Sequence, residues 1–167
     1  ISNRSSGKMG FSIAEAARDA GGLVSIISGP VNLETPNEVE RINVESADEM
    51  LKEVDKAINN FDLFISTAAV SDFKPEEYEN QKIKKQKKAN NLNLELIKNQ
   101  DILKSVSENK GDLKVIGFAA ETQNIIENAK KKLKEKNLDL IIANDVSDDS
   151  IGFDSDENEV YLITKKI

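Results

Sequence analysis

The sequence predicts an α/β fold with a doubly wound, mainly parallel, Rossmann-like sheet and helices on both faces. Short apolar runs typical of buried strands alternate with segments whose apolar residues recur at helical spacing. Alternation of this kind is typical of strand–helix–strand units, whose connections return each strand parallel to the previous one. The chain has 167 residues, 38% of them hydrophobic, so we expect one domain over 1–167 with a single core.

The first half begins with a helix expected at about 8–20, which follows the polar residues Ser5, Ser6 and Gly7 and ends at the glycine pair 21–22. Ser46 is a typical helix cap in front of apolar residues at helical spacing up to residue 58. The strands expected in this half are 23–27, 39–44 and 63–70.

The second half repeats the alternation of strands and helices. It follows a polar, lysine-rich segment at 74–91, whose composition predicts a surface flap or hairpin. The expected elements are helices near 100–109 and 123–136 and strands at 115–119, 138–143 and 160–163. A turn is expected at 152–156, before the last strand.

Composition excludes several classes of function. A net charge of −7 and a pI near 4.8 argue against general attraction to nucleic acid or to an acidic membrane, so any phosphate site must be local. With no cysteine and no histidine, the chain has no disulfide, no Ser-His-Asp or Cys-His machinery and no ordinary zinc site. No apolar run is long enough for a membrane helix, and we expect a cytoplasmic protein.

Candidate site residues follow the strands, because ligands of open α/β sheets bind beyond the carboxyl ends of the strands. Five polar spots are expected to converge there: 2–10, 66–72, 100–103, 118–122 and 144–147.

The loop at 3–10 leads into a helix N-terminus, where free N–H groups and the helix dipole favour a phosphate that Arg4 or Lys8 could also contact. The loop is not a P-loop, because Met9 follows Gly7-Lys8. A serine-capped helix with a solvated lysine is an equally good interpretation. Asp72, after the small residues of 68–71, could bind a metal or a ribose hydroxyl, or could cap a turn.

Each of two lysine-rich runs could have either an ordinary structural role or a role in phosphate binding. The run at 82–88 is either a solvated face or a basic flap that closes over a triphosphate and excludes water. The run at 130–136 suits a helix C-terminus, although Lys132 and Lys136, four residues apart, could reach one phosphate chain together. Tyr78 and Lys82 have the spacing of short-chain dehydrogenases, which is expected by chance among so many lysines.

Eight strings in order make the chain resemble the bacterial phosphopantothenoylcysteine synthetase family, and together they span nearly its whole length. They are ISNRSSGKMG at 1–10, SGPV at 28–31, AAVSD at 68–72, KIKK at 82–85, GFAAET at 117–122, NLDLI at 137–141, ANDVS at 143–147 and GFDSDEN at 152–158.

This resemblance implies a magnesium-assisted ligase of the coenzyme A pathway. The carboxylate of 4′-phosphopantothenate attacks the α-phosphate of CTP to give an acyl-cytidylate and pyrophosphate, and the amine of cysteine then displaces CMP. The first loop becomes the phosphopantothenate site, with Asn3 as a catalytic hydrogen-bond donor at the acyl intermediate. The substrate-binding residues implied are Asn3, Arg4, Ser6, Gly7 and Lys8.

The resemblance also implies a CTP site, in which Lys82 is both a binding and a catalytic residue and Asp72 contacts the ribose or the metal. ATP in place of CTP stays open. The residues implied are Ser66, Thr67, Ala68, Asp72, Lys82, Gln100, Asp101, Ile102, Leu103, Phe118, Lys132 and Lys136.

The sequence departs from the family in two places. Gln100 stands where the family has a proline, and the family's first strand and glycine-rich turn are expected before Ile1. The family implies a homodimer, and FMN would enter only with an upstream decarboxylase domain. The alternatives are a catalytically silent nucleotide-binding domain and a nicotinamide-dependent reductase.

Overall fold

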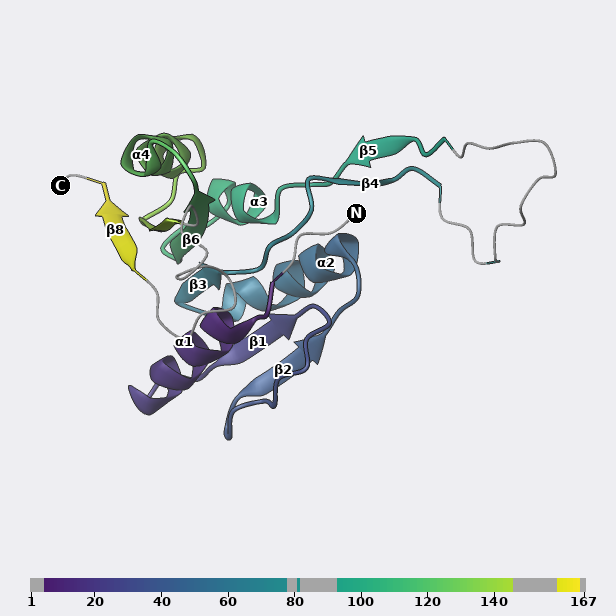
Figure 1. The fold of residues 1–167 in the computed structure, drawn as a ribbon. Coiled ribbons are helices and arrows are strands. Elements are labelled where there is room, and N and C mark those ends of the chain that lie inside the picture. Colours follow the sequence, from purple (N-terminus) through teal and green to yellow (C-terminus); the bar gives the residue numbers. More distant parts are fainter. Residues whose placement is uncertain (1–4, 78–80, 82–92, 146–158, 166–167) are drawn as a thin grey trace.

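A computed structural model describes residues 5–77, 81, 93–145 and 159–165 (Figure 1). The elements are α1 (Lys8–Asp19), β1 (Ser25–Ser28), β2 (Glu40–Asn43), α2 (Ala47–Ala57), the 3-10 turn η1 (Ile58–Asn60), β3 (Leu63–Ser66), β4 (Phe73–Pro75), β5 (Leu96–Lys98), α3 (Ile102–Glu108), β6 (Lys114–Glu121), α4 (Ile125–Glu135), β7 (Leu140–Asp145) and β8 (Val160–Thr164). Within the described residues, no helix is both long and apolar enough to cross a membrane.

The main sheet has the strand order β3-β6-β7-β8. The strands β3, β6 and β7 are parallel, whereas β8 runs antiparallel to β7 at the sheet edge. The strands β1 and β2 form a separate parallel pair, and β4 and β5 form an antiparallel ribbon that extends away from the body (Figure 1). The α/β prediction is confirmed, with a mixed sheet in which parallel pairing dominates.

One face of β6 and β7 carries the main core. Its cluster joins Val115, Ala119 and Ile141 on the strands to buried residues of α2, α3 and α4. The buried residues of α1, Phe11 and Ala14, are not part of that cluster. Helices therefore lie on both sides of the strands, with α2, α3 and α4 sharing the larger core, and the expected covering of both faces is confirmed.

Gly117 lets α3 lie directly on the central strand β6. A Cβ at this position would lie 2.8 Å from Leu103 Cδ2 and 2.8 Å from Leu138 Cδ1. Heavy atoms in van der Waals contact stand about 3.5–4.0 Å apart, so there is no room for a side chain. The glycine therefore sets the distance between helix and sheet, just below the predicted strand-end site.

Asp139 fastens the start of β7 to the start of β6. Its Oδ2 accepts hydrogen bonds from Val115 N (2.8 Å) and from Lys110 Nζ (2.7 Å), and its own N–H donates to Val115 O (2.9 Å). Burial acts to raise the pKa of Asp139, but the hydrogen bonds and the charge of Lys110 outweigh it, so the pKa is lowered. One carboxylate therefore holds the two strand starts side by side.

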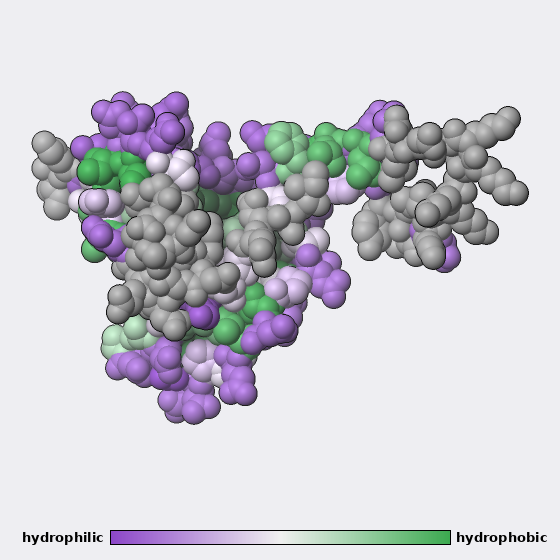
Figure 2. Space-filling view, in the orientation of Figure 1, coloured by the Kyte–Doolittle hydropathy of each residue, from purple (hydrophilic) through white to green (hydrophobic). Residues whose placement is uncertain are grey.

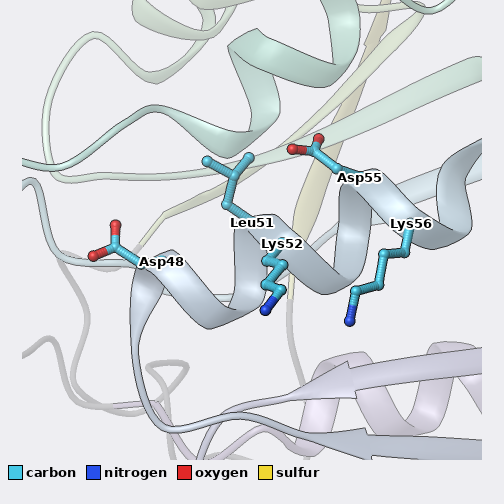
Figure 3. A pocket seen from close by; sticks show the side chains of 5 residues that line it. All are labelled: Asp48, Leu51, Lys52, Asp55 and Lys56. Atoms are coloured by element: carbon cyan, nitrogen blue, oxygen red, sulfur yellow. The ribbon is translucent and has the colours of Figure 1, made fainter.

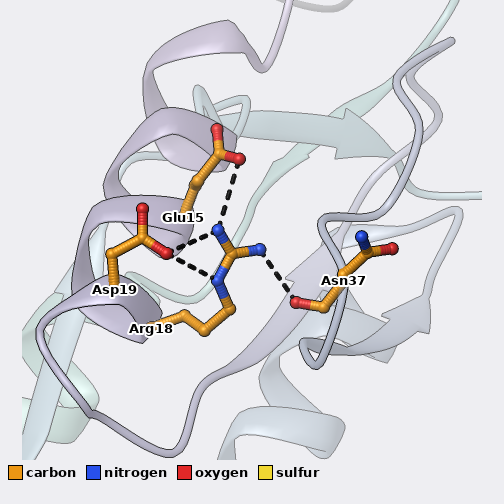
Figure 4. Close-up of polar contacts among 4 residues, drawn as sticks. All are labelled: Glu15, Arg18, Asp19 and Asn37. Carbon is orange, nitrogen blue, oxygen red and sulfur yellow. Dashed lines mark hydrogen bonds and ion pairs between the residues drawn. The ribbon is translucent and has the colours of Figure 1, made fainter.

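Arg18 ties the last turn of α1 to the loop before β2 (Figure 4). Its guanidinium donates to Asp19 Oδ1 (2.9 and 2.6 Å), to Glu15 Oε1 (3.4 Å) and, across the loop, to Asn37 O (2.9 Å). The hydrogen bonds to Asp19 raise the pKa of Arg18 despite some desolvation. These contacts hold the C-terminal end of α1 against the loop before β2. They thereby help to orient the N-terminal end of α1, which follows the predicted phosphate loop.

Most expected elements are confirmed to within a few residues. The Ser46 cap is confirmed, because its Oγ accepts from Glu49 N at 3.2 Å. The strand expected at 63–70 ends earlier, at Ser66, since β3 pairs with β6 over only four residues. The flap expected at 74–91 begins within β4, and residues 78–80 and 82–92 and the turn at 152–156 lie outside the described residues.

We predict that Gly117→Val destabilises the protein by about 1–3 kcal/mol, because two leucine side chains must move. Thermal unfolding should show a Tm lower by roughly 2–4 °C per kcal/mol. Valine has a high strand propensity, so a loss would come from packing rather than from the backbone. Gly29→Ala is the control, since open space surrounds its Cβ position; equal Tm changes in the two variants would contradict the prediction.

We predict that Asp139→Asn lowers the free energy of unfolding by about 1 kcal/mol at pH 7, the usual size of a partly screened charged hydrogen bond. The folded-state pKa is lowered. The contribution is therefore present above the unfolded pKa of about 3.9 and is lost as pH falls through the folded pKa. Urea unfolding at pH 7, 5 and 3 should show a difference between the two proteins that narrows as the pH falls. The exposed Asp112→Asn is the control, and a gap that stays constant with pH would contradict this account.

Candidate functional site

The N-terminal end of α1 lies against the carboxyl end of β3. A Cβ on Gly10 would meet Thr67 Oγ1 at 2.6 Å, so the first turn of the helix touches the segment after the strand. Gly7 is the N-cap of α1, with φ at 78° and no side chain capping the helix from that position. The structure thus brings together parts of two predicted segments, 2–10 and 66–72, through Gly10 and Thr67.

The loop at 31–33, next to the N-terminus of α1, is anchored by Arg41 of β2. Arg41 donates from Nη1 to Leu33 O (2.7 Å) and from Nε to Asn43 Oδ1 (2.7 Å), and its guanidinium lies 5.0 Å from the Phe11 ring centre. A Cβ on Gly7 would lie 3.1 Å from Val31 Cγ1. Only glycine fits that left-handed, closely packed position, so the loop conformation is set by its neighbours.

Asn99 joins the segment after β3 to the start of α3. Its N–H donates to Asp72 O and its Nδ2 donates to Ser71 O, both at 2.8 Å. The side chain is 8% exposed, and its Oδ1 has no hydrogen-bond partner in the described part of the chain. Two predicted nucleotide segments, 71–72 and 100–103, therefore share one anchor at the base of the β4–β5 ribbon.

The turn at 100–103 contributes mostly backbone groups to this region. Ile102 is 7% exposed and belongs to the core, and Leu103 packs over Gly117. Gln100 is exposed. The side chains of Ile102 and Leu103 are therefore occupied by the core, which leaves their backbone groups at the helix N-terminus for a ligand.

Asp101 has a partner for each carboxylate oxygen. Oδ1 caps α3 by accepting from Lys104 N (3.0 Å), and Oδ2 pairs with Lys136 Nζ (2.8 Å). Desolvation acts to raise the pKa of Asp101, but the hydrogen bonds from Lys136 and Lys104 N lower it overall. The ion pair between Lys136 and Asp101 therefore links the end of α4 to the start of α3.

Lys132 meets a different carboxylate. Its Nζ lies 2.5 Å from Glu121 Oε1, at the last residue of β6, and Glu121 Oε2 accepts from Asn128 Nδ2 at 3.1 Å. The Glu121 side chain is 15% exposed and that of Lys132 is 44% exposed. The two lysines predicted to share a face of α4 are thus each held by a carboxylate near the strand ends.

Phe118 stands apart from this lysine group. Successive residues of β6 point to opposite faces, so Phe118 is on the face opposite Gly117 and Glu121, and it is half-buried. Ser66 is the register partner of Gly117. The sheet therefore separates Phe118 from Lys132 and Lys136, and a ligand touching all three must reach over the strand ends.

Several predicted residues lie outside the described part of the chain. They are Asn3 and Arg4 in the first loop, Lys82 in the lysine-rich run, and Tyr78 of the dehydrogenase-like spacing.

Asp72, the predicted metal or ribose ligand, is exposed. Among the described residues, no group of three Asp, Glu, His or Cys side chains is placed to hold a metal ion. One exposed carboxylate is a donor set that suits Mg²⁺ carried on a triphosphate, which is usually bound through one or two carboxylates plus phosphates, and not a closed protein cage.

A hollow of about 390 Å³ lies elsewhere, along α2 (Figure 3). Leu51 and Asp55 point to one side of the helix there, and Lys52 and Lys56 point to the other. None of the predicted site residues lines it. It is an open surface feature on α2, away from the predicted site residues.

Sequence reasoning missed the roles of Asn99 and Glu121. Each is a polar residue at an element boundary, Asn99 after β5 and Glu121 at the end of β6, and that position was the available signal. Asn144, within the predicted spot at 144–147, is 6% exposed, and its Oδ1 has no partner among described residues. Buried polar atoms without partners are uncommon and cost about 1–3 kcal/mol each, so two of them near the strand ends distinguish this region.

Comparison with known proteins gives a family match over the whole chain. The model of the DNA/pantothenate metabolism flavoprotein C-terminal domain matches residues 1–167. The chain is similar to the coenzyme A biosynthesis bifunctional protein CoaBC of Haemophilus influenzae, with 50% identity over 171 residues that cover 99% of this chain. It is also similar to CoaBC of Vibrio vulnificus, with 46% identity over 165 residues that cover 97% of this chain. In both cases the chain spans 41% of the relative's length.

Solved structures agree with the fold. The C-terminal domain of CoaBC matches with a TM-score of 0.80 at 40% identity, covering 99% of this chain and 72% of that one. The DNA/pantothenate metabolism flavoprotein from Streptococcus pneumoniae matches with a TM-score of 0.78 at 23% identity, covering 98% and 84%, which supports the fold alone. These matches confirm the resemblance to phosphopantothenoylcysteine synthetases, and the chain belongs to the family of the DNA/pantothenate metabolism flavoprotein C-terminal domain.

Proposed function

We propose that this chain is a phosphopantothenate–cysteine ligase domain that uses CTP. The observation that supports it most is the meeting of predicted nucleotide segments at the strand ends, through Asn99 to Ser71 and Asp72 and through Lys136 to Asp101. The similar CoaBC proteins are named for coenzyme A biosynthesis. A silent nucleotide-binding domain is the alternative that the experiment below separates.

In the first step, a carboxylate oxygen of 4′-phosphopantothenate attacks the α-phosphorus of CTP and pyrophosphate leaves, giving an acyl-cytidylate. The N-terminus of α1, with Gly7 in a left-handed conformation, suits the phosphate of phosphopantothenate, because the helix dipole and N–H groups favour anions. Lys132 and Lys136 suit the triphosphate, because their ammonium groups can pair with its negative charge in the bound nucleotide. Ser66, Thr67 and Ala68, at the carboxyl end of β3, are proposed as further nucleotide contacts.

In the second step, the cysteine amine attacks the acyl carbonyl, the bond to the CMP oxygen breaks, and a proton leaves the nitrogen as the amide forms. Asn3 is proposed to donate a hydrogen bond to the carbonyl oxygen as it gains negative charge, a role that suits a neutral donor. Lys82 is proposed to orient the nucleotide during the same step. Arg4, Ser6 and Lys8 are proposed as further contacts of the phosphopantothenate phosphate.

Magnesium, when bound with the triphosphate, would neutralise phosphate charge and align the leaving group. Asp72 is the residue that would contact it or the ribose, with its backbone carbonyl already engaged by Asn99 N.

The test is pyrophosphate release by the full-length polypeptide with phosphopantothenate and each of the four nucleoside triphosphates, with and without cysteine. We expect release that requires phosphopantothenate and is fastest with CTP. Release that is equal with ATP would correct the nucleotide, and no release with any of the four would favour a silent binding domain. Thermal protection by CTP with Mg²⁺ but not by NADPH would separate the ligase from a reductase.

The variant Asn3→Ala separates the two steps in the same assay. We expect pyrophosphate release to continue for about one turnover and amide formation to fall by roughly 10²–10³-fold, the usual loss for one oxyanion donor. Mass spectrometry of the quenched reaction should then show accumulated acyl-cytidylate. An unchanged rate of amide formation would remove Asn3 from the mechanism.

We further propose a homodimer joined through the β4–β5 ribbon. The ribbon leaves the body of the molecule and carries exposed apolar side chains at Phe73 (54%), Leu94 (60%), Leu96 (43%) and Ile97 (39%) (Figure 2). A cluster of exposed apolar residues on a two-stranded ribbon marks a surface that another chain covers. A second copy of the chain is the partner that the family resemblance favours.

We predict that Phe73→Ser combined with Leu96→Ser converts the protein from a dimer to a monomer, because the change removes apolar area from the ribbon. Light scattering after size exclusion gives the mass directly. Leu23→Ser is the control, since Leu23 is 96% exposed but lies just before β1, away from the ribbon. A wild-type monomer, or a dimer that survives the double substitution, would contradict this interface.

A further inference from the structure

Glu121 has contacts that no catalytic role explains. It is the last residue of β6, and its side chain is largely buried. Both carboxylate oxygens are used, Oε1 by Lys132 Nζ at 2.5 Å and Oε2 by Asn128 Nδ2 at 3.1 Å. Asn128 Nδ2 also donates to Gln123 O at 2.9 Å, which fixes the orientation of the amide. Glu121 is therefore held rigidly between a strand end and a helix.

Lys132 is much more exposed to solvent than Glu121. Its side chain is 44% exposed, and the described contacts of its ammonium group are with Glu121 alone. An ammonium group has three N–H donors, so Lys132 can keep its bond to Glu121 and still donate to a phosphate oxygen. A lysine side chain that is free in solution samples many rotamers, and holding it in one conformation removes an entropy cost from ligand binding.

We propose that Glu121 is a positioning residue that holds the Lys132 ammonium group ready for the triphosphate of the nucleotide. The inference rests on the proposed CTP-dependent function. Glu121 acts through Lys132 and does not touch the substrate, so its effect falls on the affinity for the nucleotide and not on the chemical steps.

The neighbouring pair, Asp101 and Lys136, has the same arrangement on the same face of α4. Asp101 also caps α3 through Oδ1. Substituting Asp101 would therefore change a helix start as well as a lysine, and Glu121 is the cleaner residue for a test.

The central variant is Glu121→Gln. Glutamine offers one acceptor and one N–H₂ donor, so it can satisfy Lys132 or Asn128 but not both, and turning the Asn128 amide would break its bond to Gln123 O. We expect the KM for CTP to rise by about three- to tenfold, the range for losing one charge-assisted contact at a partly exposed site. The kcat and the KM for phosphopantothenate should stay within about twofold.

Glu135→Gln is the matched control. Glu135 pairs with Lys131 on the same helix at 3.8 Å, and both side chains are mostly exposed. The substitution removes one carboxylate charge that pairs with a different lysine of α4, and it leaves Lys132 untouched. It should leave the KM for CTP unchanged, which separates a local effect from a general change in net charge.

A double-mutant cycle decides whether Glu121 works through Lys132. Lys132→Gln alone should raise the KM for CTP, and adding Glu121→Gln to it should cause no further rise, because the group being positioned is gone. Additive effects would mean a separate structural role and would overturn the proposal. So would an unchanged or lower KM in Glu121→Gln, the latter identifying Glu121 as a competitor of the phosphate.

The outcomes for the two proposals stay distinguishable. Wild-type protein without CTP-dependent pyrophosphate release would contradict the proposed function itself. In that case, isothermal titration with CTP and Mg²⁺ measures the affinity directly and keeps the cycle meaningful for a binding domain. Wild-type activity together with normal CTP kinetics in Glu121→Gln would contradict only the positioning role.

Discussion

The close contact of α3 with β6 at Gly117 is the constraint on which the site depends. Leu103 fills the space that a side chain on Gly117 would occupy, and this fixes the first turn of α3 relative to the sheet. Asp101, two residues earlier, is then placed to cap the helix and to hold Lys136, and Asn99 is placed to bond the carbonyls of residues 71 and 72. A core contact thus determines which polar groups meet at the strand ends.

The proposed triphosphate site depends on local charges, because the protein as a whole is acidic. The chain has a net charge of −7, so long-range attraction does not favour a triphosphate. Lys132 and Lys136 are nevertheless held near the strand ends by Glu121 and Asp101. Each pair is close to neutral before a ligand arrives, and each ammonium group keeps donors available. In the proposed site, the local arrangement of these N–H donors, and not the overall charge, favours the triphosphate.

Local sequence signals identified the elements well. The Ser46 cap, the helical spacing of apolar residues and the strand-end position of the polar spots all depend on residues near one another in the chain. The link between Asn99 and Ser71 spans 28 residues and the pair of Lys136 with Asp101 spans 35, so neither leaves a local pattern. The direction of β8 could not be predicted either, because an edge strand has similar alternation whether it runs parallel or antiparallel.

The sequence by itself determined the α/β class, the positions of most helices and strands and, through its eight ordered strings, the family. Periodicity and capping are local, and a family resemblance is read from residue identities, so neither requires coordinates. Only the tertiary structure decided that the side chains of Ile102 and Leu103 belong to the core, that Phe118 lies on the opposite face from the α4 lysines, and that Glu121 holds Lys132. These facts depend on packing between distant segments, which sets side-chain partners that no local pattern specifies.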